Sequence, residues 1–225
     1  MSVAILADPH GNLVALQAVL EAARKLSPSK FIVAGDLVGY GPKPNEVIAL
    51  VEEIGALSIR GNHDRAVIDR DYTGMNPHAA EAARWTSKVI TPRNLKRLNS
   101  LRQFEIVDIE GRKIGLHHGS PDDPDEYVLE ESRARQLLEQ SDCDVMICGH
   151  THVPMLVSLN GKLFINPGSV GQPRDGNPAA AFMEFNLRTL RAVLHRVEYS
   201  IEITQEEMSL EGLPRFLIDR LSKGY

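Results

Sequence analysis

Residues 3–23 read VAILADPHGNLVALQAVLEAA, and this stretch predicts the first unit of an α/β fold. The apolar run at 3–7 is typical of a short strand buried on both faces, and Asp8-Pro9 ends it. Asn12 can cap a helix that follows. Apolar residues then recur at helical spacing, at Leu13, Leu16, Val19, Leu20 and Ala23. A strand and a helix joined by a polar turn favour a parallel sheet.

The same pattern continues through the first half of the chain. Strands are predicted at 31–34 and 56–59, with a helix at 45–54 between them, and these extend the parallel sheet. From about 65 to 101 the apolar spacing is helical and no strand is evident. This stretch is interpreted as a helical insertion or lid.

The second half favours hairpins. Antiparallel pairs are predicted at 104–109 with 113–116, at 155–159 with 162–165 around the turn residues Asn160-Gly161, and at 179–185 with 190–197. A helix at 130–140 and a strand at 144–147 lie between them. The mixture predicts an α/β protein with two mixed sheets packed face to face and helices outside. With no linker, repeat or low-complexity segment, residues 1–225 are expected to form one domain.

The composition is that of a soluble globular protein. Of the 225 residues, 43% are hydrophobic and 24% charged, and no apolar run approaches the roughly 18 residues of a membrane helix. The N-terminal stretch has no basic region and reaches Asp8 too early for a signal peptide, so a cytoplasmic location is expected. A formal net charge of −5 argues against extended nucleic-acid binding. The two cysteines, Cys143 and Cys148, have no metal-binding or disulfide pattern.

Seven oxygen or nitrogen donors follow predicted strands, where ligands of α/β sheets bind. They are Asp8, His10, Asp36, Asn62, His118, His150 and His152. Five of the eight histidines fall in three glycine-flanked clusters, GNHD at 61–64, HHGS at 117–120 and GHTHVP at 149–154. In the last cluster, histidines two apart can project to the same side of an extended segment.

Each short motif alone also has an ordinary structural explanation. The Asp8 stretch can be a turn, Asp36 can be a cap, and a single loop histidine is usually a surface residue. Together the seven donors favour a metal centre, and their number indicates two ions rather than one. Carboxylate, amide and imidazole ligands suit manganese, with iron, zinc, nickel, cobalt or magnesium as alternatives, and the lack of thiolates argues against structural zinc.

The motif order resembles that of the calcineurin-like metallophosphoesterase superfamily, and most closely its small single-domain bacterial and archaeal members. The resemblance rests on DPHGN at 8–12, GDLVGYGP at 35–42, the three histidine clusters, and NPGSVGQPRDG at 166–176. It implies a four-layer αββα sandwich, in agreement with the two predicted sheets. It also implies a ligand set: Asp8, His10 and His152 on one ion, Asn62, His118 and His150 on the other, and Asp36 bridging.

The resemblance further implies the reaction. A hydroxide bridging the ions would attack a phosphate mono- or diester, and His63, unligated and oriented by Asp64, would protonate the leaving group. The neighbouring His117 is expected to lie in the core or behind the ligands. Tyr40, Arg60 and Arg174 are candidate contacts for a small phosphate-ester substrate, although a surface or packing role is equally open for each.

Two other functions remain open from the sequence. The chain could be a catalytically silent scaffold with this fold, as in the retromer subunit that resembles the family, or a protein that senses a nucleotide without hydrolysing it. Retention of all seven donors and of His63 favours the enzyme. No membrane partner is expected, and a homo-oligomer is possible.

Overall fold

The first β-sheet is built around the strand that precedes Asp8. In the computed structural model, which describes residues 1–225, this sheet has the order β10-β9-β1-β2-β3. β1 (Ser2–Leu6) pairs in parallel with β2 (Lys30–Val33), which pairs in parallel with β3 (Leu57–Ser58). On its other side β1 pairs antiparallel with β9 (Ala180–Asn186), and β10 (Arg191–Val197) completes the sheet as the hairpin partner of β9.

The second β-sheet has the order β4-β5-β6-β8-β7. Its three central strands are parallel: β5 (Arg112–Leu116), β6 (Val145–Ile147) and β8 (Lys162–Asn166). The edges β4 (Glu105–Ile109) and β7 (Met155–Leu159) are antiparallel hairpin partners of β5 and β8. Both sheets are therefore mixed, and the three hairpins predicted from the sequence are confirmed.

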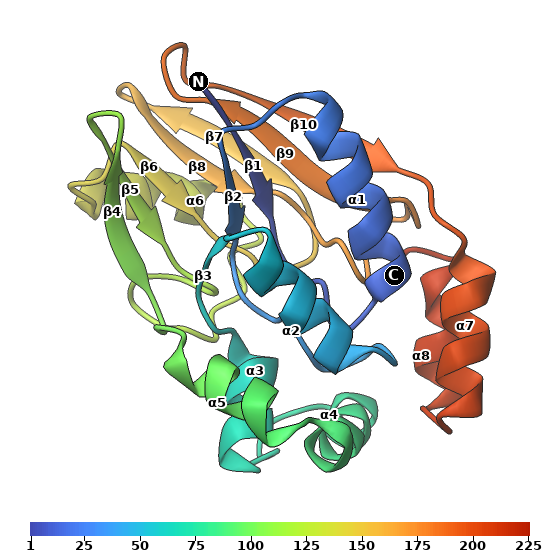
Figure 1. Cartoon of the computed structure of the whole chain (residues 1–225). Helices are drawn as coiled ribbons and strands as arrows, with labels where there is room; N and C mark the ends of the chain where they lie inside the picture. The colour runs from blue at the N-terminus through green and yellow to red at the C-terminus, as the bar shows by residue number, and fades with distance from the viewer.

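Three layers of apolar side chains hold the sheets and helices together. Ile5 and Ile32 of the first sheet meet Ile114 and Ile147 of the second, and all four are fully buried. The outer face of the first sheet is covered by α1 (Leu13–Lys25) and α2 (Pro44–Glu53), and that of the second by α6 (Glu131–Gln140) (Figure 1). The predicted four-layer αββα sandwich is confirmed.

The stretch from 62 to 100 forms three helices at one end of the sheets. They are α3 (Asn62–Asp69), α4 (Pro77–Val89) and α5 (Pro92–Ser100). Proline begins α4 and α5, where its missing N–H costs no hydrogen bond, and the side chains of Asn76 and Thr91 cap the two helices. Helix α3 begins three residues earlier than the predicted helical stretch. That these helices act as a lid stays a prediction.

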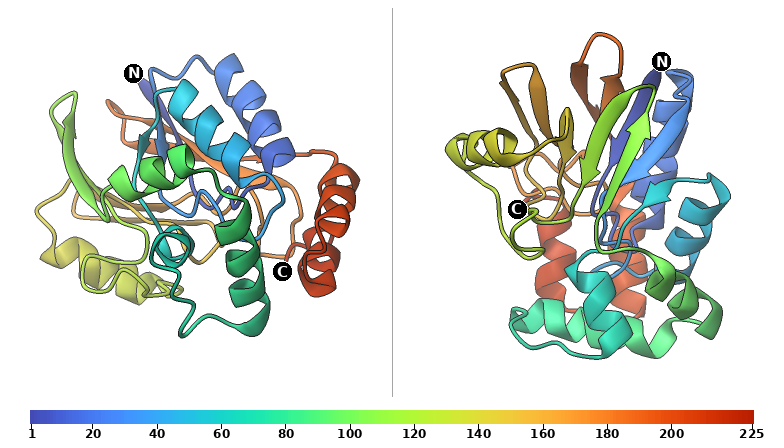
Figure 2. Two further views of the ribbon diagram at one scale, coloured as in Figure 1. Left: turned by 60° about the horizontal axis from the view of Figure 1, so that its bottom comes forward. Right: turned by 90° about the vertical axis from the view of Figure 1, so that its left-hand side faces the viewer.

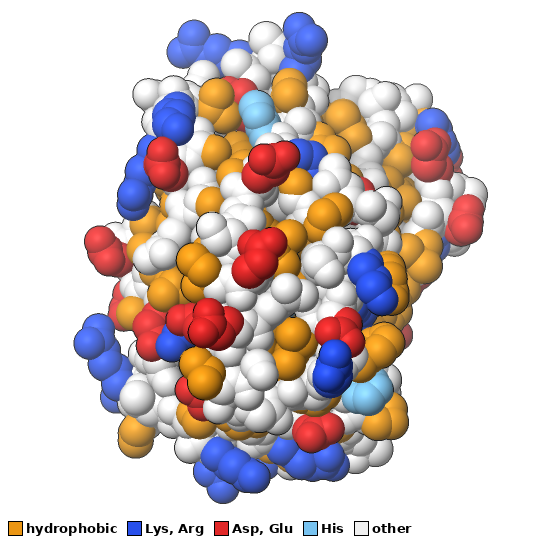
Figure 3. Space-filling view, turned by 90° about the vertical axis from the view of Figure 1, so that its right-hand side faces the viewer, with side chains coloured by type: hydrophobic (Ala, Val, Ile, Leu, Met, Phe, Trp, Pro, Cys, Tyr) orange, Lys and Arg blue, Asp and Glu red, His pale blue; other side chains and the backbone are white.

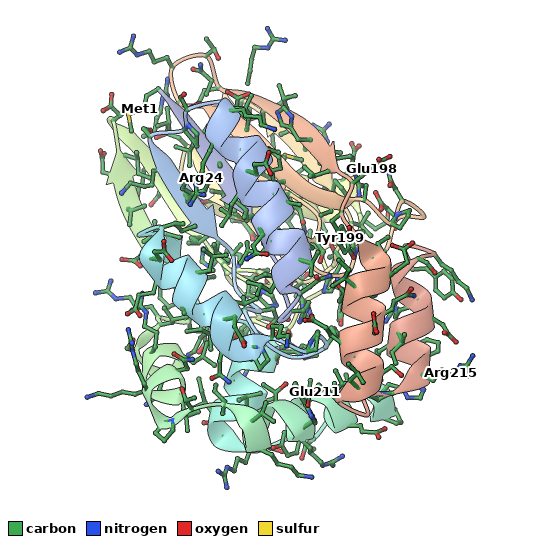
Figure 4. The ribbon with its side chains drawn as sticks, turned by 45° about the vertical axis from the view of Figure 1, so that its right-hand side comes forward. Met1, Arg24, Glu198, Tyr199, Glu211 and Arg215 are labelled. Carbon is green, nitrogen blue, oxygen red and sulfur yellow. The ribbon has the colours of Figure 1, made fainter.

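Two further helices, α7 (Ile201–Leu210) and α8 (Arg215–Leu221), form a pair that was not predicted from the sequence. The pair lies beside α1 at the same end of the molecule as α3 to α5 (Figures 1 and 2). Figure 4 shows Tyr199 on the segment that leads into α7, and Glu211 and Arg215 at the turn between the helices. Met208 and Leu217 of this pair pack in one cluster with Tyr40.

None of the helices has both the length and the apolar character needed to cross a membrane. On the face that carries α7 and α8, Lys and Arg side chains are interspersed with Asp and Glu (Figure 3). This face therefore has no continuous basic patch.

Replacing Leu217 with alanine is expected to lower the free energy of unfolding by about 2–5 kcal/mol, because its side chain is buried and truncation leaves a cavity. Leu217 is only 1% exposed, whereas Leu210 of the same helical pair is 81% exposed. Leu210→Ala is the matched control and should change stability by less than about 0.5 kcal/mol. Urea unfolding measures both, and equal effects would show that α8 does not pack on Tyr40 in solution.

Candidate metal centre

Five of the seven predicted ligands have a left-handed backbone conformation. The φ angles are 54° for Asp8, 49° for His10, 53° for Asp36, 67° for His150 and 60° for His152. Residues other than glycine adopt this conformation uncommonly, and it is often found at functional sites. The turns after these strands therefore hold the side chains in directions that ordinary extended backbone would not give.

One group of donors comprises Asp8, His10 and His152, all buried. The Nδ1 atom of His10 donates to the carbonyl oxygen of Val38 at 2.9 Å, and that of His152 donates to the carbonyl of Gln172 at 2.5 Å. Because each Nδ1 carries the hydrogen, each neutral ring presents only a lone pair at Nε2. The two Nε2 atoms lie 3.1 Å apart, and Oδ1 of Asp8 lies 3.7 Å from Nε2 of His152.

A second group is arranged in the same way around His118. Its Nδ1 donates to the carbonyl oxygen of Ala34 at 2.7 Å, so its Nε2 is an acceptor when the ring is neutral. That Nε2 lies 3.1 Å from Oδ1 of Asn62 and 3.3 Å from Oδ2 of Asp36. The same Asp36 oxygen is 3.5 Å from Nε2 of His10. Asp36 thus lies between the two groups.

His150 completes the second group. Its Nε2 donates a hydrogen bond to the carbonyl oxygen of Asp125 at 3.1 Å. The lone pair of its Nδ1 is therefore the one that can bind a metal ion. Potential ligand atoms of Asp36, His118 and His150 all lie within 4.8 Å of one another. The structure therefore brings together all seven donors predicted from the sequence.

The buried charges and lone pairs fit a divalent cation. Burial raises the pKa of Asp8 to about 8, although His118 opposes the shift. For His118, burial alone would lower the pKa. The negative charges of Asp36 and Asp8 outweigh burial, and the pKa of His118 is raised to about 10. Burial lowers the pKa of His150 to about 3, so its ring is neutral at pH 7. Asp8 and His118 therefore hold protons at pH 7 that a divalent cation could replace, and nitrogen with oxygen ligands suits a transition metal.

Two glycines leave room for this arrangement. A Cβ atom on Gly61 would lie 2.1 Å from Oδ1 of Asp36, and one on Gly39 would lie 2.3 Å from Nδ1 of His63. Both distances are far below van der Waals contact. The glycines of the GNHD and GDLVGYGP motifs are therefore required by close packing around Asp36 and His63.

His63 lies beside the donors, but Asp64 does not orient it. The carboxylate of Asp64 accepts from the backbone N–H groups of Gly61 at 2.9 Å and Val38 at 3.1 Å. Asp64 is the third residue of α3, where a carboxylate reaches back to cap the helix, so its side chain is unavailable to its neighbour. The expected contact between Asp64 and His63 is absent.

The ring of His63 is instead held by its neighbours. Its centroid lies 4.4 Å from that of Tyr40 and 4.7 Å from that of His10. Its backbone N–H donates to Oδ1 of Asp36 at 2.8 Å. The Nδ1 atom is buried without a hydrogen-bond partner.

Two of the three candidate substrate residues lie at the centre, and the third does not. Nη2 of Arg174 donates to the hydroxyl of Tyr40 at 3.1 Å and to Oε1 of Gln172 at 3.2 Å. Arg60 makes no hydrogen bond or ion pair with the centre, since its segment pairs with Arg102 through a backbone hydrogen bond of 2.9 Å. The predicted contact between Arg60 and the site is therefore absent from the structure.

His117 and the segment at 121–127 complete the surroundings. The ring of His117 stacks on Phe104, with centroids 5.7 Å apart, so it points away from the donors while His118 points toward them. Tyr127 and Asp125 were not singled out in the sequence, yet the Tyr127 ring lies 3.9 Å from that of His150. Only the proline-rich and aspartate-rich turn signal of PDDPDEY marked this loop.

Comparison with known proteins decides the family. Residues 1–188 match the model of the calcineurin-like phosphoesterase superfamily domain. The chain belongs to the calcineurin-like phosphoesterase superfamily. This confirms the predicted family and the predicted reaction class, metal-dependent hydrolysis of phosphate esters.

Three relatives show how much of this phosphoesterase is shared. A metallophosphoesterase from Sphaerobacter thermophilus is 36% identical, with a TM-score of 0.88 over 100% of this chain and 99% of the other. An uncharacterized protein of Methanocaldococcus jannaschii is also 36% identical, over 99% of this chain and 98% of its own length. Phosphodiesterase YfcE of Escherichia coli is 27% identical over 80% of this chain and 85% of its own length.

Metal binding by the phosphoesterase is expected to release about one to two protons per chain at pH 7. The pKa values of Asp8, about 8, and His118, about 10, leave both groups protonated at pH 7 without metal, and ligation requires their unprotonated forms. Affinity should therefore fall as the pH is lowered from 8 to 6. Calorimetric titration with Mn²⁺ in two buffers of different ionisation enthalpy measures the release. Equal heats in both buffers would contradict the expectation.

Proposed function

We propose that this phosphoesterase hydrolyses small phosphate mono- or diesters with two divalent ions held by the seven donors. The position of Asp36 is the observation that carries the proposal. One of its carboxylate oxygens lies 3.5 Å from His10 in the first group and 3.3 Å from His118 in the second. A carboxylate within reach of imidazoles from both groups supports a bridging role.

Manganese is the proposed metal, with iron, zinc, nickel, cobalt or magnesium as alternatives. When bound, two such ions lower the pKa of a shared water and neutralise charge on the phosphoryl oxygens. The protein's contribution is to fix the ligand geometry. Hydrogen bonds to the carbonyls of Val38, Ala34 and Gln172 set the tautomer and direction of three imidazoles.

His63 is the proposed proton donor to the leaving oxygen. Burial lowers its pKa to about 4, with Asp36 opposing and Arg174 adding to the shift, so the ring is neutral at pH 7 in the protein without metal or substrate. A phosphate ester beside the ring adds negative charge, which raises that pKa and favours the protonated form. Asp64 supports this role only indirectly, by fixing the start of α3.

Arg174 and Tyr40 are the proposed contacts for the phosphate. Arg174 makes no ion pair with a carboxylate, and its Nε is buried without a partner. Its guanidinium lies 5.6 Å from the centre of the Tyr40 ring. A guanidinium with free donors beside the metal centre suits a phosphate oxygen.

The remaining functional predictions are proposals of the same kind. A small substrate is favoured because the net charge is −5 and the cleft beside His63 is lined by Asp69, Asp71 and Asp125 but only one cation, Arg65. Diester cleavage is supported by the similarity to a phosphodiesterase. A cytoplasmic location and a homo-oligomer remain predictions.

The purified protein, stripped of metal and reloaded with Mn²⁺, is expected to hydrolyse p-nitrophenyl phosphate or its bis ester. Release of p-nitrophenol measures the activity, and the protein without metal is the control. Full metal occupancy without turnover of either ester, whichever metal is loaded, would favour the silent scaffold or the nucleotide sensor instead.

His63→Gln is expected to lower kcat by about 10²–10⁴-fold while manganese content stays unchanged, because it removes a proton donor and no ligand. His78→Gln, at an exposed histidine of α4, is the matched control and should leave both values unchanged. Elemental analysis of the loaded proteins measures the metal. Because potential ligand atoms of His63 also lie within 4.8 Å of those of His10 and Asp36, a parallel loss of metal and activity would identify His63 as a ligand.

A further inference from the structure

The metal centre opens into a cleft of about 360 Å³ on the side of His63. Its lining comes from α3, from the 71–76 loop that follows, and from the loop that carries Asp125 and Tyr127. Asn62, His63 and His150, which lie at the metal centre, also line it. A group attached to a phosphate at the metal centre can extend into this cleft.

The cleft wall contains more negative than positive charge. Nη2 of Arg65 donates to both carboxylate oxygens of Asp125, at 2.7 and 2.6 Å, so these two charges compensate each other. Asp69 and Asp71 also line the cleft, and neither makes an ion pair. The side chain and backbone N–H of Thr73 donate to Oδ1 of Asp71, which lowers the pKa of that carboxyl and keeps it ionised.

The inner part of the cleft offers aromatic surface. Tyr127 is 52% exposed, and its ring lies against that of His150 with centroids 3.9 Å apart. The ring of Tyr40, which is only 4% exposed, forms the cleft wall beside His63 and adds little open surface. A planar ring is therefore the group that this surface can pack against.

His63 is an independent sign that something binds here. Its side chain is only 4% exposed and lines the cleft. Its Nδ1, which lies against Gly39, is buried without a hydrogen-bond partner, and no protein group bonds to its Nε2. Buried polar groups in native proteins are normally hydrogen-bonded, so the missing partner is expected to come from outside the chain.

On the basis of the proposed function, we propose that this cleft receives the leaving group and selects an uncharged or cationic alcohol with a planar ring over an anionic one. In the reaction, water forms a new bond to phosphorus and the bond to the leaving oxygen breaks. The leaving oxygen takes a proton from the protonated ring of His63, the attacking water releases a proton to solvent, and His63 regains its proton from solvent before the next turnover. A nucleoside belongs to the favoured class, whereas a nucleotide or polyphosphate leaving group is disfavoured by Asp69 and Asp71.

Three phenyl phosphates with a 4-aminomethyl, 4-hydroxymethyl or 4-carboxymethyl substituent test the charge preference, as monoesters and as methyl diesters. With the Mn²⁺-loaded protein, kcat/KM is expected to be about three- to tenfold lower for the anionic ester than for the neutral one at low salt. This ratio should shrink as salt is added, because the two aspartates are exposed.

The double variant Asp69→Asn/Asp71→Asn should bring the ratio of neutral to anionic kcat/KM close to one. Intrinsic reactivity cancels, because the same ratio is compared between two proteins. Glu139→Gln/Asp142→Asn removes two exposed negative charges on and beside α6 and is the matched control, which should keep the wild-type ratio. A ratio that is unchanged in the cleft variant, or equally changed in the control, would overturn the charge selection.

Substitution at Tyr127 tests the preference for a ring. Tyr127→Phe keeps the stacking surface, whereas Tyr127→Ala should raise KM several-fold for the phenyl leaving group but not for a small alkyl one. Metal content is measured for both, since Tyr127 contacts His150. An equal effect on both leaving groups would overturn the ring preference. Absence of hydrolysis with any ester and any metal would instead refute the proposed function itself.

Discussion

The structure around the carboxyl ends of the strands depends on one electrostatic constraint: two buried carboxylates share a small space with imidazoles that present lone pairs. Asp8 and Asp36 are at most 1% exposed, and each lies within 4.0 Å of more than one imidazole nitrogen. Without a cation the chain must compensate by holding protons, as the raised pKa values of Asp8 and His118 show. A pair of divalent ions removes that need.

Backbone strain is the cost of meeting this constraint. Left-handed conformations cost on the order of 1–3 kcal/mol each, and five of them occur at predicted ligands. The surrounding contacts hold the strained turns in place. For example, the Ser169 hydroxyl donates to the carbonyl oxygen of Asp8 at 2.9 Å, and the Asn166 amide donates to that of Gly149 at 2.7 Å. Asn166 and Ser169 belong to the 166–176 motif. One structural role of that motif is therefore to hold the strained turns that carry the predicted ligands.

Much of the fold and most of the metal centre could be predicted from the sequence, because both follow from local patterns. Buried strands show as apolar runs, and donors directly after them must meet at one edge of the sheets. Asp64, Arg60 and Tyr127 could not be placed this way. Whether Asp64 caps its helix or orients a neighbour depends in part on the backbone N–H of Val38, which lies far away in the sequence and donates to the Asp64 carboxylate. The positions of Arg60 and Tyr127 depend on contacts with distant segments that have no regular spacing.

The pairing of β1 with β9 has a consequence for biosynthesis. The register joins Val3 to Phe185, so one edge of β1 has no partner until Phe185, more than 180 residues later, has been made. The donors at 8, 36, 118 and 152 are likewise spread along most of the chain. Contacts between such distant segments form slowly. During translation, β1 therefore waits longer for its β9 neighbour than any other strand waits for a partner, and its open edge is a site that a chaperone has reason to protect.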